Sequence, residues 1–248
     1  MIDNINLLLN RIEAEYQVKI LYACETGSRA WGFPSPDSDY DVRFIYHHPK
    51  NWYLALHEQK DTIEFMDGDL DITGWDLRKS LQLLKKSNVP LIERFNSPII
   101  YLDNNFSSQF NELIQSFYSP TSVFFHHYSL ATKFWEDIKD AETYKLKSFF
   151  YLLRSLLSCI WVTNDKSVVP MEIEKLFVHI DTDAADAIRR LISLKFTVGE
   201  KYLHQKDALH DWVNAKLEIL KLAKEMELGV AHSGIHPLND FFIQMLES

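Results

Sequence analysis

The sequence predicts an α+β fold, in which a small mixed β-sheet domain is followed by a helical domain. Two observations predict it. In the first part of the chain, short β-prone runs alternate with turn signals. From about residue 104 onward, the apolar residues recur almost wholly at helical spacing. We place the boundary near the segment "YSPT", which divides the chain into domains of residues 1–118 and 119–248.

The first elements follow one another in a simple order. Residues 1–17 carry apolar side chains at helical spacing. The run "VKILYACE" (18–25) predicts a strand that ends at a loop with two glycines, and "YDVRFIY" (40–46) predicts a second strand. The stretch "TIEFMDGDLDIT" (62–73) predicts two short strands around Asp67-Gly68, a dipeptide typical of hairpins. A helix is expected to begin in "WDLRKSLQLLKKS".

Composition limits the classes of function. The 248 residues have a net charge of −9, which argues against indiscriminate binding to nucleic acid or to an anionic membrane. Two cysteines make a disulfide framework unexpected and favour a reducing compartment. The N-terminus lacks the basic and apolar blocks of a secretory signal, and the longest apolar stretch is short and contains Arg154. We therefore expect a soluble cytoplasmic protein that does not bind a membrane.

Like charges are concentrated at the start of the second strand. Asp39 and Asp41 are two residues apart, so their side chains point to the same face of the strand, where Arg43 also points. Two neighbouring carboxylates repel each other and stay ionised together only when a positive charge lies between them. A divalent cation with oxygen ligands supplies that charge. The alternative is an ordinary polar turn rich in Asp and Ser.

A third carboxylate lies on the later strand. Asp71 stands between Leu70 and Ile72, where an unpaired carboxylate is costly, whereas Asp69 is closer to the hairpin turn. Carboxylates from neighbouring strands commonly hold two metal ions in phosphoryl chemistry. Gly27 and Ser28 end the first strand, and such a turn lets backbone amides approach a phosphate.

Other motifs fail at specific positions. An EF-hand loop that starts at Asp37 would need Gly and Glu where the chain has Val42 and His48. A P-loop that starts at Gly27 would need Lys where the chain has Phe33. The segment "DLDIT" resembles the nucleophile motif of haloacid-dehalogenase-like phosphatases, but their alternating framework of strands and helices is not visible.

The motifs together resemble the nucleotidyltransferase superfamily that includes DNA polymerase beta. That pattern is Gly-Ser, a spacer, Asp-x-Asp and a third carboxylate downstream. Three segments are similar to bacterial predicted nucleotidyltransferases that include RNA-ligase-associated members: "GSRAWGFPSPDSDYDVR", "LDITGWDLRKSLQLLKKSNVPLIERFNSPIIY" and "KSFFYLLRSLL". The resemblance covers roughly residues 20–160. One departure is "SNVP", where the family usually has Ser-Asn-Pro.

The resemblance implies a fold, an activity and a set of residues. Residues 1–118 would be the catalytic domain. Asp39, Asp41 and Asp71 would hold Mg²⁺ or Mn²⁺, and Asp71 would assist deprotonation of the acceptor hydroxyl. Gly27 and Ser28 would contact a nucleoside triphosphate, with ATP as the expected donor. The implied reaction transfers a nucleoside monophosphate to a hydroxyl of an RNA end, a protein or a small molecule, and releases pyrophosphate.

The helical part adds a second group of candidates. Lys147, Tyr151 and Arg154 share a helix face by their spacing, and two cations that flank an aromatic ring suit a triphosphate and a stacked base. The alternative is a solvated basic stripe. A second face, with apolar side chains, suits packing. We expect the site between the sheet and the helical domain.

Two other functions stay open from the sequence alone. One is a non-catalytic module of the same fold that binds nucleotide or RNA. The other is an aspartate-dependent phosphatase, which would release free phosphate through a covalent aspartyl intermediate. Metal-dependent release of pyrophosphate distinguishes the predicted transferase from both.

Overall fold

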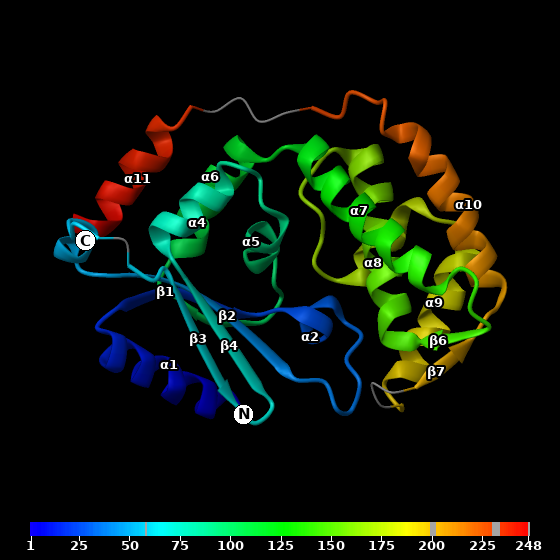
Figure 1. Ribbon diagram of the computed structural model, residues 1–248, viewed down its shortest axis with the longest axis horizontal. Coiled ribbons are helices and arrows are strands. Elements are labelled where there is room, and N and C mark those ends of the chain that lie inside the picture. The colour runs from blue at the N-terminus through cyan, green and yellow to red at the C-terminus, as the bar shows by residue number, and fades with distance from the viewer. Residues whose placement is uncertain (58, 199–201, 230–233, 248) are drawn as a thin grey trace. The chain divides into compact units, whose positions relative to one another are not determined.

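The computed structural model describes residues 1–57, 59–198, 202–229 and 234–247 (Figure 1). It confirms the predicted α+β class, with a five-stranded mixed sheet and many helices. The chain forms two compact units. The first contains residues 1–27 and 39–118 with the described part of 231–248, and the second contains 28–38 with the described part of 119–230. The domains 1–118 and 119–248 themselves stay a prediction.

The first unit is built on a sheet with the strand order β3-β4-β2-β1-β5. Strands β2 and β4 are parallel, and the other neighbouring strands are antiparallel. The strands are β1 (Lys19–Glu25), β2 (Tyr40–His47), β3 (Thr62–Asp67), β4 (Leu70–Asp76) and β5 (Ile100–Asp103). The predicted strands at 18–25 and 40–46 are therefore confirmed, whereas β5 was not predicted.

Strands β3 and β4 form the predicted hairpin. Asp67 pairs with Leu70, so Gly68 and Asp69 make a two-residue turn. Gly68 has a φ of 58°, in the left-handed region that glycine adopts without steric cost. Beyond the predicted end at residue 73, β4 continues to Asp76, because it pairs with β3 on one side and with β2 on the other.

Helices cover both faces of this sheet. On one face, Ile5, Leu9 and Ile12 of the first helix join a buried cluster with Val42 and Phe44 of β2. On the opposite side of the sheet lie α4 and α6 (Figure 1). The helices of this unit are α1 (Ile2–Tyr16), α3 (Lys50–Tyr53), α4 (Leu77–Leu84), α5 (Val89–Arg94), α6 (Phe106–Phe117) and α11 (His236–Glu247). The core thus fixes which side chains of β2 point away from α1.

The second unit is mainly helical. It contains most of α2 (Gly27–Trp31), then α7 (Pro120–Ile138), α8 (Leu146–Asp165), η1 (Ile173–His179), α9 (Thr182–Lys195) and α10 (Ala208–Ala223). A small antiparallel pair, β6 (Thr143–Lys145) and β7 (Leu203–Gln205), was not predicted. Pro120 stands at the first position of α7, where its missing N–H leaves no bond unmade.

Helix α8 is the central element of this unit. By length and composition alone it could cross a membrane, but 72% of its most apolar 18-residue stretch is buried inside the structure. Its buried residues lie on nearly every side of the helix. That pattern is typical of a core helix. The predicted packing face is confirmed, since its members are all buried: Leu146, Phe149, Leu153, Leu156 and Ile160.

The segment 28–38 packs on this helical unit. The ring of Phe33 stacks on that of Phe150, with 4.6 Å between ring centroids. The ammonium of Lys195 lies 5.7 Å from the Phe33 ring and 3.5 Å from the Ser35 Oγ. The segment between β1 and β2, expected as a loop, therefore contains the short helix α2 and is held by buried side chains.

Candidate functional site

Two carboxylates meet on the parallel strands β2 and β4. Asp41 and Asp71 are Cα partners in this pair, so their side chains share a position along the sheet. Alternation along β2 buries Val42 and Phe44 against α1 and turns Asp41 to the opposite face. Both aspartates are about one third exposed, with side-chain exposures of 30% and 35%. The sequence-predicted carboxylates of the two strands are thus brought together.

The cation between these carboxylates is Arg43. Its Nη2 lies 3.0 Å from Asp41 Oδ1 and 2.8 Å from Asp71 Oδ2. Its Nη1 donates to the backbone carbonyls of Val42 and Asp71, at 3.1 and 2.8 Å. The guanidinium therefore supplies a positive charge between the two carboxylates. The divalent ion expected at Asp39, Asp41 and Asp71 stays a prediction.

The backbone of Gly27 lies against the carboxylate of Asp41. Its φ is 63°, in the left-handed region, and a Cβ built on it would lie 2.2 Å from Asp41 Oδ2. Neither the backbone conformation nor the space admits a larger side chain without adjustment. The neighbouring Thr26 donates from its backbone N and its Oγ1 to the carbonyl of Asp41. These two bonds hold the chain that leads into Gly27 next to Asp41. Gly27 and Asp41 are thus in direct contact.

Glu25 is a residue that sequence reasoning missed. It is fully buried at the end of β1, where its Oε1 accepts the backbone N–H of Asp41 at 2.7 Å and its Oε2 accepts the hydroxyl of Tyr101. The signal in the sequence was a lone glutamate that ends an apolar strand, since burial of such a charge requires partners. Glu25 therefore anchors the backbone that carries Asp41.

The thiol next to Glu25 is not a nucleophile at neutral pH. Cys24 is fully buried, and burial raises the pKa of its thiol to about 12. The reactive form of cysteine is the thiolate, which is nearly absent at such a pKa. The chemistry of this face is therefore that of carboxylates and one guanidinium.

The third predicted ligand, Asp39, lies just before β2 and is exposed. Within the residues that the structure describes, no three His, Cys, Asp or Glu side chains gather closely enough to hold a metal ion. The donor chemistry nevertheless fits one. Asp41 and Asp71 offer carboxylate oxygens, which hard divalent cations prefer, and these two oxygens already meet at one cationic nitrogen.

Ser28 belongs to a group of serines in the segment 28–38. Its Oγ donates to Ser38 Oγ at 3.1 Å, and Ser38 Oγ also accepts the backbone N–H of Ser35 at 2.9 Å. Arg29 Nη2 donates to the Ser38 carbonyl at 2.7 Å. These bonds fix the turn that carries Ser28. Its predicted contact with a triphosphate stays a prediction.

The three candidates on α8 differ in exposure. Lys147 is exposed, whereas Tyr151 is half-buried. The Tyr151 ring stacks on Phe134 and meets the edge of Trp31, at centroid distances of 5.5 and 5.3 Å. Lys147 is thus the candidate on this helix that solvent reaches most readily.

Arg154 is buried, with 3% of its surface exposed. Its Nη1 donates to Ser158 Oγ at 3.1 Å, its Nη2 approaches Met171 Sδ at 3.8 Å, and its guanidinium lies 5.3 Å from the Trp31 ring. A buried guanidinium with such partners contributes to the packing of the helical unit. A nucleotide-binding role for Arg154 stays a prediction.

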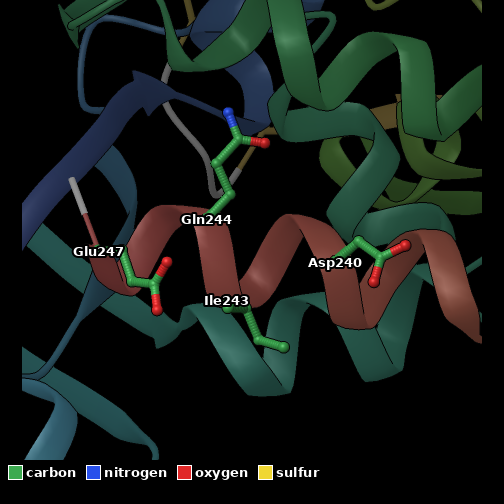
Figure 2. Close-up of a pocket in the computed structure, with 4 residues that line it drawn as sticks. All are labelled: Asp240, Ile243, Gln244 and Glu247. Carbon is green, nitrogen blue, oxygen red and sulfur yellow. The ribbon is translucent and has the colours of Figure 1, made fainter.

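Two hollows among the described residues of the first unit are lined by residues other than the predicted ones. One, of about 430 Å³, is lined by Asp240, Ile243, Gln244 and Glu247 of α11 (Figure 2). Figure 2 shows these four side chains spread along a single helix. A second, of about 210 Å³, lies between α4 and α11. Neither carries the chemistry of the Asp41–Arg43–Asp71 group.

The chain matches a family model, a curated protein and a solved structure. A family model described as RlaP, the RNA repair pathway DNA polymerase beta family, matches residues 1–244. The uncharacterized protein YcgL of Bacillus subtilis (strain 168) is 38% identical over 225 residues, which span 88% of this chain and 86% of YcgL. A crystal structure of a nucleotidyltransferase-like protein from Exiguobacterium sibiricum 255-15 is 12% identical, covers 87% of this chain and 73% of its own, and has a TM-score of 0.30. That last likeness is too distant to bear on fold or function.

Proposed function

The chain belongs to the RlaP family, the RNA repair pathway DNA polymerase beta family, and we propose that it is a nucleotidyltransferase. The reaction transfers a nucleoside monophosphate from a nucleoside triphosphate to a hydroxyl group. The hydroxyl oxygen forms a bond to the α-phosphorus, the bond from this phosphorus to the bridging oxygen of the β-phosphate breaks, and pyrophosphate leaves.

The observation that carries the proposal is the pairing of Asp41 with Asp71 beside Gly27. Asp41 and Asp71 stand opposite each other on adjacent parallel strands, and Gly27 contacts the carboxylate of Asp41. A pure binding module for an anionic nucleotide gains nothing from clustered carboxylates, because they repel phosphate. Their presence favours a site that handles phosphate together with a cation.

Asp41 and Asp71, with Asp39 two residues before Asp41, would hold Mg²⁺ or Mn²⁺. Such an ion, when bound, offsets the charge of the phosphates and polarises the reacting oxygens. Asp71 is the residue we assign to receive the proton of the acceptor hydroxyl. Glu25 and Gly27 act on the position of Asp41, the first through its backbone N–H and the second through contact with its carboxylate.

Gly27 and Ser28 would contact the nucleotide, and the residues predicted on helix α8 are further candidates for binding it. Among the α8 candidates, the exposed Lys147 offers a charge for the triphosphate and Tyr151 offers a ring for the base. Arg154 would support this face from its buried position against Trp31. We assign ATP as the donor.

The acceptor would be the end of an RNA, with a protein side chain as the second candidate. The RNA acceptor is supported by the family description, which refers to RNA repair. A cytoplasmic location is supported by the two cysteines, which are both free and buried. The phosphatase alternative finds no support in the sheet, because β2–β4 is its one parallel pair among the described strands.

The experiment that tests the proposal is transfer of label. The protein is incubated with each nucleoside triphosphate, labelled at the α-phosphorus, and with RNA or protein fractions of a lysate. We expect label in the RNA fraction with Mg²⁺ present, and none with EDTA or with the Asp71→Asn variant. Label in the protein fraction would favour the second acceptor, and absence of label in every fraction would contradict the transferase.

A further inference from the structure

Arg43 is held by groups of the two strands that carry the carboxylates. Its side chain is 18% exposed, and it contacts the carboxylates of Asp41 and Asp71 and the carbonyls of Val42 and Asp71. A guanidinium that joins two carboxylates and two carbonyls is a well-defined arrangement of charge-assisted hydrogen bonds. It stabilises one fixed geometry of the pair.

The oxygens that Arg43 holds are those that a metal ion would need. Of the two carboxylate oxygens of Asp41, Oδ2 lies against Gly27, so close that a Cβ there would stand 2.2 Å away. The other, Oδ1, is bound by Arg43 Nη2. The same nitrogen binds Asp71 Oδ2. A metal ion that bridges the two aspartates through these oxygens therefore has to displace the Arg43 guanidinium.

Because of their like charges, the Arg43 guanidinium and a divalent cation cannot both occupy the position between Asp41 and Asp71. Asp41, Asp71 and Arg43 together carry a net charge of −1. With the guanidinium in place, a divalent cation encounters a partly neutralised pair and a like charge at its centre. With the guanidinium withdrawn, the two carboxylates repel each other unless the ion takes its place. The bound state of one cation thus excludes that of the other.

We propose that Arg43 is an internal competitor of the catalytic metal ion. In the metal-free protein it keeps Asp41 and Asp71 together, and it leaves Asp41 Oδ1 and Asp71 Oδ2 when a divalent cation binds. This inference rests on the proposed function, since it concerns the same carboxylates. Its consequence is a metal affinity lower than the carboxylate pair alone would give, because part of the binding free energy displaces the guanidinium.

The test compares thermal unfolding of Arg43→Met with that of the wild type, without nucleotide, in EDTA and in excess Mg²⁺. Methionine keeps an unbranched stem and removes the charge. We expect the variant to melt at a lower temperature in EDTA, because the carboxylates then repel each other. We expect its affinity for Mg²⁺ to rise about tenfold, which in excess Mg²⁺ corresponds to a Mg²⁺-induced shift in Tm larger than that of the wild type by about 3–6 °C.

Arg43→Gln is the second variant, read in the same way if Arg43→Met does not fold. The matched control is Arg189→Met, because Arg189 also joins two carboxylates, those of Glu174 and Asp186, but on an exposed surface. The control is expected to respond to Mg²⁺ as the wild type does. Equal or smaller Mg²⁺-induced shifts in the Arg43 variants than in the wild type would overturn the proposal.

This result can be told apart from failure of the transferase proposal. Unfolding without nucleotide reports metal binding alone, whereas label transfer reports the reaction. If Arg43→Met responds more strongly to Mg²⁺ but the wild type transfers no label, the proposed competition between Arg43 and the metal ion stands and the transferase proposal is rejected. If the wild type transfers label but Arg43→Met responds to Mg²⁺ as the wild type does, the transferase proposal stands and the competition is rejected.

Discussion

Asp41 and Asp71 are partners on parallel strands and contact the same guanidinium nitrogen of Arg43. Replacement of Asp41 by Asn keeps the shape and removes one charge of this group. We expect transfer to fall by roughly a hundredfold or more, as for loss of a preorganised charge at a reacting phosphate. Stability in EDTA should change by at most about 1 kcal/mol, since the ion pair is partly exposed. Assays of transfer and of thermal unfolding check both, and a large loss of stability would favour a purely structural turn.

The second prediction concerns Gly27→Ala. The substitution places a Cβ in a left-handed backbone and 2.2 Å from Asp41 Oδ2. We expect a loss of about 1–3 kcal/mol in the free energy of unfolding, measured with urea. In the double variant with Asp41→Ala the contact disappears but the backbone strain remains, so part of this loss should be recovered. Gly234→Ala is the control, because its Cβ would meet nothing within 4 Å. Equal losses in Gly27→Ala and Gly234→Ala would disprove the contact.

Glu25 gives the third prediction. Glu25→Gln keeps an oxygen for the N–H of Asp41, whereas Glu25→Leu leaves this buried donor without its acceptor. The leucine variant should lose about 1–3 kcal/mol of stability and the glutamine variant clearly less. Chemical denaturation of both variants decides the order. If leucine is tolerated as well as glutamine, Glu25 does not anchor the start of β2.

The fourth prediction concerns acid stability. Burial, with a smaller effect of His47, lowers the pKa of His48 to about 4, against 6.5 for an unburied histidine. Between these values the unfolded chain binds a proton that the folded chain does not, so stability falls as the pH falls from about 6.5 toward 4. His48→Phe retains a ring to stack on Trp52, now 3.9 Å from the imidazole, and does not titrate.

Melting temperatures of His48→Phe and wild type, compared at neutral pH and near pH 5, measure this effect. We expect the variant to lose less in acid than the wild type. An identical loss would mean that other groups, such as the buried His127, whose pKa burial lowers further, account for all of the acid sensitivity.

The fifth prediction separates the cations of α8. Lys147→Ala should weaken binding of Mg-ATP by about one to two decades, the cost of roughly 1.5–3 kcal/mol for one charge-assisted contact. Adenosine, which offers no phosphate, should bind almost unchanged. Lys147→Met controls for loss of the aliphatic stem. Titration calorimetry measures these affinities, and wild-type binding of Mg-ATP by Lys147→Ala would leave the lysine as a solvated charge.

The elements with strong local patterns could be predicted from the sequence. Strands β1 and β2 and the hairpin of β3 and β4 follow from short apolar runs and from the Asp67-Gly68 signal. The strands that escaped prediction, β5, β6 and β7, have only three or four residues. Such short runs carry too little periodicity to be distinguished from loops, and their pairing depends on distant parts of the chain.

The sequence predicted the residue types of the site and part of its local arrangement. The same-face spacing of Asp41 and Arg43 is local, so the sequence places them together. That Arg43 reaches both Asp41 and Asp71 depends on which strand neighbours β2, and this is a property of the folded sheet. Burial of Arg154 was hidden for a similar reason, because helical spacing does not reveal that α8 is covered on nearly all sides.

The measurement that tests the central claim most directly is the ratio of pyrophosphate to phosphate released from ATP in the presence of RNA. We expect one pyrophosphate for each nucleoside monophosphate transferred, dependence on Mg²⁺ or Mn²⁺, and loss of release in both Asp41→Asn and Asp71→Asn. Free phosphate as the product would instead indicate a phosphatase. Binding of ATP without any release, or release that persists in both variants, would contradict transfer at these two carboxylates.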